Sequence, residues 1–253
     1  KIIYHYHFCQ YKIRSMFYIK SEAYISEKGK NNINEDTLAY IKGRLYMVCD
    51  GVGGNGNGLL ASQILSESIC NSLNNEASIS VYDAVRVAEK VLERYKDKAP
   101  KTAAMASTVA LTQIKENSVL ISWIGDSRVY QFRDGKIIYK TTDHTKISEL
   151  IKNGSITEHE ALFHPDVNIL TKVIKGSKQP VAIEQVILTD VEEDDYFLIC
   201  SDGIIESWID ADLIALFSKT NTPDNIMEVL GKQCSIFSND NYTAIVYQLG
   251  INK

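Results

Sequence analysis

Two strand-like segments of this chain end in the same way, and this shared ending constrains the fold more than any other feature. Residues 45–49 lead into Asp50, and residues 195–200 lead through Ser201 into Asp202. Both segments are mostly apolar, as buried strands are, and a glycine follows each aspartate. After Asp50, glycine occupies almost every other position, which lets backbone groups come close to an ion or a phosphate. The same pattern also occurs in plain tight turns that feed a helix.

Further carboxylates fall at the ends of other predicted strands. Glu35 and Asp36 precede the strand predicted over 37–42, and Asp240 precedes the strand predicted over 242–249. Any one of them alone is typical of a solvated turn. If the strand ends converge, however, like charges repel and the cluster needs cations to be stable.

Oxygen ligands without histidine or cysteine nearby favour Mg²⁺ or Mn²⁺ over Zn²⁺. Two such ions about 4 Å apart can lower the pKa of a bridging water and neutralise the oxygens of a phosphorus centre.

The rest of the chain alternates groups of strands with helices. Apolar residues recur at helical spacing over 59–73, and Ser80 with Asp83 predicts the start of a second helix. Short β-branched segments between 107 and 140 predict an antiparallel meander. The other predicted elements are helices within 141–165 and over 223–234, and strands over 169–174 and 181–188.

The 253 residues are enough to bury one large core, so we expect a single domain over 16–253. Residues 1–15 are expected to be an N-terminal extension or an added leader without a role in the fold, and Met16 is the expected natural start.

Composition excludes several classes of function. The net charge of −5 argues against a general nucleic-acid binder, which needs a basic face. No apolar run reaches the roughly 18–20 residues of a bilayer span, so we expect no membrane partner. The cysteines are scattered and odd in number, which favours buried thiols in a reducing, cytoplasmic compartment; they are Cys9, Cys49, Cys70, Cys200 and Cys234.

Seven short motifs, in order along the chain, resemble those of the metal-dependent PPM serine/threonine phosphatases, the protein phosphatase 2C type. They are Asn34-Glu35-Asp36, Asp50-Gly51-Val52-Gly53-Gly54, Gly125-Asp126-Ser127-Arg128, Thr142-Asp143-His144-Thr145, Leu170-Thr171, Cys200-Ser201-Asp202-Gly203 and Asp240-Asn241 with Thr243. The resemblance extends from Tyr18 to Leu249. It implies an α+β fold: a four-layer α-β-β-α sandwich of two central antiparallel sheets flanked by helices, with the metals in a channel at one edge.

The resemblance also implies roles for individual residues. Asp50 would bridge two Mg²⁺ or Mn²⁺ ions, with Glu35 and the Gly51 carbonyl on one ion and Asp202 and Asp240 on the other.

Two further carboxylates complete the implied site. Asp36 would hold metal-bound waters, and Asp126 would share a weaker third ion with Asp202. The predicted catalytic residues are Asp36, Asp50, Asp202 and Asp240.

The sequence departs from the family pattern at two places. Asn31 stands where family members usually carry an arginine that grips the phosphate. Lys28 and Lys30 are candidate substitutes, although a lysine does not offer the bidentate fork of arginine. Val52 stands where animal relatives carry a histidine that serves as general acid. His144 is a weaker candidate for that work, because a flap or turn residue pairing with Asp143 is the favoured interpretation.

The resemblance implies a monomeric phosphatase that hydrolyses phosphoserine and phosphothreonine in proteins, countering a cognate kinase in a bacterial cytoplasm. The segment 145–165 corresponds to the flap that shapes substrate access in relatives. A catalytically silent relative that binds a phosphoprotein or a regulator is the main alternative, and Asn31 is the feature that favours it. A nucleotide phosphodiesterase is a third reading, for which the sequence offers no support.

Overall fold

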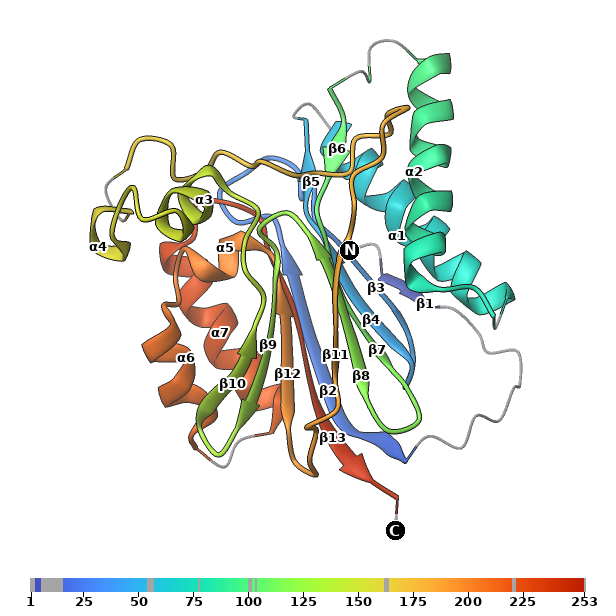
Figure 1. Cartoon of the computed structure of the whole chain (residues 1–253). Coiled ribbons are helices and arrows are strands. Elements are labelled where there is room, and N and C mark those ends of the chain that lie inside the picture. Colours follow the sequence, from blue (N-terminus) through green and yellow to red (C-terminus); the bar gives the residue numbers. More distant parts are fainter. Residues whose placement is uncertain are drawn as a thin grey trace.

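Two β-sheets pack face to face, with helices on the outer side of each, in the computed structural model of this protein (Figure 1). This arrangement confirms the predicted four-layer sandwich. The described residues are 3–5, 16–53, 57–76, 78–99, 102, 104–161, 164–219 and 222–252.

The first sheet has the order β1-β3-β4-β7-β8-β11, and neighbouring strands are antiparallel except for β1 and β3, which are parallel. Its strands are β1 (Ile3–His5), β3 (Thr37–Ile41), β4 (Leu45–Cys49), β7 (Val109–Ile114), β8 (Val119–Ile124) and β11 (Glu184–Leu188). Helices α1 (Asn57–Asn75) and α2 (Val81–Lys98) cover its outer face (Figure 1).

The second sheet has the order β10-β9-β12-β13-β2 and is antiparallel throughout. Its strands are β2 (Phe17–Glu27), β9 (Arg128–Arg133), β10 (Lys136–Lys140), β12 (Tyr196–Cys200) and β13 (Tyr242–Ile251). Its outer face is covered by α5 (Asp202–Ile205), α6 (Asp210–Phe217) and α7 (Pro223–Phe237). The remaining elements are β5 (Gly51–Val52), β6 (Ala106–Ser107), α3 (Lys146–Lys152) and α4 (Glu158–Ala161).

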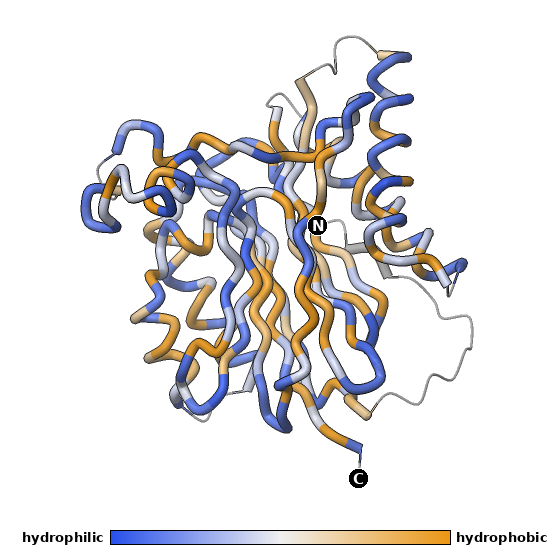
Figure 2. The backbone as a smooth tube through the Cα atoms, in the orientation of Figure 1, coloured by the Kyte–Doolittle hydropathy of each residue, from blue (hydrophilic) through white to orange (hydrophobic). Residues whose placement is uncertain are grey.

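Three hydrophobic clusters fill the gaps between the layers. In the cluster between the sheets, the ring centroids of Tyr46 and Tyr247 are 4.7 Å apart and those of Tyr247 and Phe197 are 5.1 Å apart. The Tyr247 hydroxyl is hydrogen-bonded to Thr112 Oγ1 at 2.9 Å, so its polar end is satisfied although the ring is buried. Figure 2 shows the hydrophobic residues concentrated along the central strands.

The predicted helix starts are confirmed by their capping bonds. Ser80 precedes α2, and its Oγ accepts the Asp83 N–H at 3.0 Å. Thr157 precedes α4 and exchanges bonds with Glu160 in the same way. None of the helices within the described ranges combines the length and the apolar character needed to cross a bilayer.

The predicted meander over 107–140 is wrong. β7 and β8 pair in the first sheet, whereas β9 and β10 pair in the second, so the chain changes sheets at 125–127. Both sheets offer a buried apolar face, and the spacing of β-branched residues therefore predicts the strands but not their partners.

Two other expectations need correction. Residues 169–174 form only two isolated bridges, at Leu170 and Ile174, because their backbone meets different partners in turn rather than one continuous strand. In the segment 1–15, expected to have no role in the fold, residues 3–5 form β1 and pair with β3, which otherwise would present an open edge. Residues 6–15, including Cys9, lie outside the described residues.

Asp195 joins neighbouring strands at the end of the second sheet. Its side chain is fully buried and accepts hydrogen bonds from Arg133 Nε at 2.7 Å, Arg133 Nη2 at 2.9 Å and Gln131 Nε2 at 2.7 Å.

We expect Asp195→Ala to lower the free energy of unfolding by about 3–5 kcal/mol in urea denaturation, because the arginine and glutamine donors lose their carboxylate. Glu193→Ala is the control, since this exposed carboxylate pairs with Lys20 and is worth at most about 1 kcal/mol. Equal losses in the two variants would contradict this account.

Candidate metal centre

A cavity of about 960 Å³ lies where the ends of β4, β8 and β12 meet the start of β13. It combines groups from both sheets, because Asp50 follows β4 whereas Asp202 follows β12. Six of the seven residues predicted to bind metal line it: Glu35, Asp50, Gly51, Asp126, Asp202 and Asp240. The seventh, Asp36, lies in an adjacent pocket.

The glycine-rich segment is required by a close approach of two backbones. A Cβ on Gly51 would lie 2.2 Å from the Gly58 carbonyl oxygen, and a Cβ on Gly58 would lie 2.4 Å from the Gly51 carbonyl oxygen. The Gly58 N–H also donates to Glu35 Oε1 at 3.2 Å, so the start of α1 orients this carboxylate. Residues with a side chain cannot fit at either position without moving the loop.

Asp50 is fixed to the turn that carries Asp126. The Asp50 N–H donates to Thr108 Oγ1 at 3.0 Å, and the Thr108 N–H donates to the Asp50 carbonyl at 2.9 Å. Thr108 Oγ1 is in turn hydrogen-bonded to Ser127 Oγ at 2.7 Å. The bonds of Thr108 therefore connect two of the predicted ligand segments.

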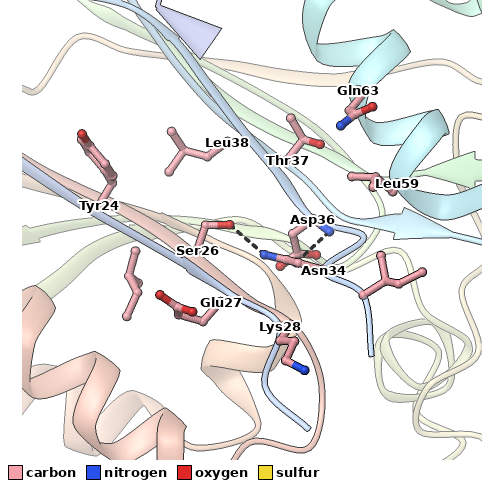
Figure 3. A pocket seen from close by; sticks show the side chains of 12 residues that line it. Tyr24, Ser26, Glu27, Lys28, Asn34, Asp36, Thr37, Leu38, Leu59 and Gln63 are labelled. Atoms are coloured by element: carbon pink, nitrogen blue, oxygen red, sulfur yellow. Dashed lines mark hydrogen bonds between the residues drawn. The ribbon is translucent and has the colours of Figure 1, made fainter. Parts of the chain in front are cut away.

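Asp36 is buried behind the cavity, with 5% of its surface exposed. Ser201 Oγ donates to Asp36 Oδ2 at 2.7 Å, which connects β3 of one sheet to the end of β12 in the other. Figure 3 shows Asp36 beside Asn34, whose Oδ1 accepts the Asp36 N–H at 3.1 Å and whose Nδ2 donates to Ser26 at 2.9 Å. Together with Lys28, they line a second pocket, of about 370 Å³.

Asn31 contacts a predicted ligand directly. Its Nδ2 donates to Asp240 Oδ1 at 2.7 Å, and the Asn241 N–H donates to the same oxygen at 2.7 Å. Lys30 is directed elsewhere, because its Nζ donates to Asn239 Oδ1 at 2.9 Å. Neither Lys28 nor Lys30 lines the larger cavity, so neither replaces the missing arginine there.

Arg128 is the one positively charged side chain among the described residues that line the cavity. Its guanidinium is already occupied: Nε and Nη2 bond the two Asp143 carboxylate oxygens at 2.8 and 2.7 Å, and Nη1 donates to the Tyr130 hydroxyl at 2.9 Å. The cavity therefore has a strongly acidic lining.

Burial and neighbouring charge raise the pKa of these aspartates. Burial first, and then the nearby Asp202 charge, raise the pKa of Asp36 and of Asp126 to about 7. Burial and the Asp240 charge raise the pKa of Asp202 to about 6, against a hydrogen bond with Asp50 that lowers it. The pKa of Asp50 is raised well above its usual value by burial and by the surrounding carboxylates. Asp50 and Asp202, one from each sheet, are therefore close enough for the charge of Asp202 to raise the pKa of Asp50.

The donor chemistry fits a hard divalent cation. The Oδ1 atoms of Asp36, Asp126 and Asp202 are buried and have no protein partner, and all the predicted donors are oxygens. No three histidine, cysteine, aspartate or glutamate side chains form a ready-made metal site within the described residues. The Gly51 carbonyl or solvent would therefore have to complete the coordination of a bound cation. The assignment of individual ligands stays a prediction.

The sequence analysis missed one residue at this site and misjudged another. Glu206 lines the cavity and accepts the Asn239 N–H at 2.8 Å, a contact across 33 positions that local spacing does not indicate. His144 is 7% exposed, and burial lowers its pKa. Its Nδ1 accepts the Gly125 N–H at 3.0 Å and its Nε2 bonds Glu184 at 2.7 Å, so it is buried in a structural network that includes Glu184 and not the neighbouring aspartate.

The profile of the family described as Protein phosphatase 2C matches residues 26–234. The chain belongs to the protein phosphatase 2C family. The structure of Staphylococcus aureus Stp1 is similar, with a TM-score of 0.83 and 26% identity over 94% of this chain and 98% of that one. The structure of Mycobacterium tuberculosis PstP/Ppp has a TM-score of 0.81 and 26% identity over 91% of this chain and 98% of that one.

Sequence relatives agree with this assignment. Serine/threonine phosphatase stp of Listeria innocua is 23% identical over 213 residues, which are 81% of this chain and 84% of that protein. Serine/threonine protein phosphatase PstP of Mycobacterium tuberculosis is 24% identical over 225 residues, which are 87% of this chain. This protein phosphatase 2C chain spans 43% of that relative's length.

The raised pKa of Asp126 predicts a pH-dependent stability. Its pKa is about 7 when folded and about 4 when unfolded, so the folded state binds the proton more tightly. This stabilising contribution is complete below about pH 4 and is lost as the pH rises through 7. The test measures the Tm of chelator-treated protein by calorimetry. We expect the Tm of Asp126→Asn minus the Tm of wild type to rise by at least about 3 °C from pH 4 to pH 8.

Asp134→Asn is the matched control for the change of charge, because Asp134 lies in an exposed turn with a φ of 50°, which asparagine also adopts. A Tm difference between Asp126→Asn and wild type that is the same at pH 4 and pH 8 would contradict the expected titration.

Proposed function

We propose that this protein phosphatase 2C member hydrolyses phosphoserine and phosphothreonine in proteins. The observation that carries the proposal is the convergence of six predicted metal-binding residues on one cavity between the sheet ends. Bound Mg²⁺ or Mn²⁺ supplies Lewis acidity there, since it lowers the pKa of water and neutralises phosphoryl oxygens.

Each residue has a proposed part. Asp50 would contribute to both ion sites, with Glu35 and the Gly51 carbonyl in one and Asp202 and Asp240 in the other. The lining of one cavity by all five residues supports this division. We propose that two ions bind. The catalytic domain of PstP has been solved with two manganese ions. At 23% identity, however, that likeness shows only a shared fold.

Two other carboxylates act around this core in the proposal. Asp126 takes part in a weaker third ion site, which its buried and unpartnered Oδ1 supports. Asp36, oriented by Ser201, holds solvent at the back of the site. Solvent protonates the leaving serine oxygen, because Val52 offers no proton and His144 is buried with both ring nitrogens bonded.

The cellular setting is part of the proposal. The described cysteines Cys49, Cys70, Cys200 and Cys234 are all free and buried, which supports a reducing cytoplasm. Phosphoproteins and the kinase that modifies them are the proposed partners.

The catalytic proposal is tested on p-nitrophenyl phosphate. We expect Mn²⁺-dependent turnover that a chelator abolishes and added Mn²⁺ restores. Asp202→Ala should lower kcat at least about a hundredfold, because it removes a predicted ligand of the activating ion. Asp212→Ala, an exposed change on α6, is the control. Wild-type turnover no faster than that of Asp202→Ala would instead support the silent scaffold that binds phosphoproteins.

The bond from Asn31 to Asp240 gives a separate prediction about affinity for the ion. Asn31→Ala removes a donor that orients Asp240, and we expect Mn²⁺ to bind roughly tenfold more weakly by isothermal titration calorimetry. Asn32→Ala, at the exposed neighbouring position on the same cavity, is the control. An unchanged dissociation constant in Asn31→Ala would show that Asn31 does not orient Asp240 for metal.

A further inference from the structure

The cavity that holds the predicted metal ligands also has an apolar wall. α3 contributes Ile147 and Ile151, the segment after α4 contributes Val167, and the stretch between α5 and α6 contributes Ile209. Figure 1 shows α3 and α4 at the same end of the molecule as α5. This wall therefore borders the carboxylates directly and is not a separate surface.

Part of the wall is exposed to solvent. Ile209 is 64% exposed and Val167 is 47% exposed, and Ile33, which lines the same cavity outside the wall, is 44% exposed. Exposed apolar side chains that lie singly are common on any protein. Ile33, Val167 and Ile209 differ from such isolated side chains because they line one cavity, together with the carboxylates where a phosphate ester would react.

The charge of the lining is one-sided. Within the described part of the chain, seven carboxylate side chains line the cavity: Glu35, Asp50, Asp126, Asp143, Asp202, Glu206 and Asp240. The guanidinium of Arg128 is engaged by Asp143 and is not available to an incoming acidic group. Divalent ions would offset the charge of the central carboxylates, whereas Glu206 is exposed and caps the turn before β13; we call this exposed carboxylate the acidic rim. Basic groups are therefore attracted to the rim and acidic groups are repelled.

We propose that this cavity selects, among phosphoproteins, segments in which an apolar side chain lies within two positions of the phosphorylated residue and the further neighbours are basic rather than acidic. The inference rests on the proposed phosphatase activity. An extended segment advances about 3.3 Å per residue, so two neighbours of a phosphoserine span about 7 Å, and Val167 and Ile209 of the wall line the same cavity as the carboxylates. The apolar wall recognises the near neighbour, and the acidic rim recognises the charge beyond it.

The test compares three phosphoserine peptides of equal length with p-nitrophenyl phosphate, using wild type with Mn²⁺. One peptide has leucine beside the phosphoserine and arginine further out, a second replaces leucine with glycine, and a third replaces arginine with glutamate. We expect kcat/KM to fall roughly tenfold in the second and third peptides, mainly through KM. The penalty for glutamate should shrink as the salt concentration rises, whereas the penalty for glycine should not.

A matched pair of variants locates the preference on the wall. Ile209→Ala removes an apolar group from the cavity, and Ile236→Ala makes the same change on α7 at a side chain that is also 64% exposed. We expect Ile209→Ala to lower the leucine-over-glycine preference about fivefold, and Ile236→Ala to leave it as in wild type.

Equal kcat/KM for the three peptides, with p-nitrophenyl phosphate turned over normally, would overturn this inference and leave the proposed activity standing. Absence of turnover on every substrate would overturn the proposed activity and this inference with it. A leucine preference that both isoleucine variants retain in full would also overturn the assignment of the preference to this wall.

Discussion

Repulsion between carboxylates is the constraint around which this molecule is built. Asp50 and Asp202 come from different sheets, and burial together with the charge of nearby carboxylates raises the pKa of each. Such a cluster opposes folding, so the surrounding structure has to be rigid enough to hold it. Three hydrophobic clusters between four layers provide that rigidity, and a divalent cation would remove most of the remaining cost.

The site is rigid because its supporting bonds cross between segments that are far apart in the sequence. Ser201 reaches Asp36 from the opposite sheet, and Thr108 connects Asp50 to the turn that carries Asp126. Asn31 and the Asn241 backbone both donate to one oxygen of Asp240. These donors orient the carboxylates without neutralising them, so the charge of the cavity is retained for an ion and a substrate.

The position of Asn31 shows how a family site can change while its carboxylates stay. The guanidinium expected there is absent, and the asparagine instead supports a predicted ligand. In our proposal, bound ions would recognise the phosphate, and the acidic rim and the apolar wall would recognise the protein substrate. The proposed chemistry and the proposed selection of substrates would then share one cavity.

The sequence alone determined the strands and helices that depend on local pattern, such as β8, β10 and the capped start of α2, and the identity of the acidic strand ends. The order of the seven sequence motifs also determined the family, which the profile match confirms. Only the tertiary structure decided that β7 and β8 pair in one sheet while β9 and β10 pair in the other, since strand pairing depends on long-range packing. It also decided that Asn31 holds Asp240 and that Glu206 joins the cavity, because these contacts connect residues separated by tens to hundreds of positions, which local spacing does not encode.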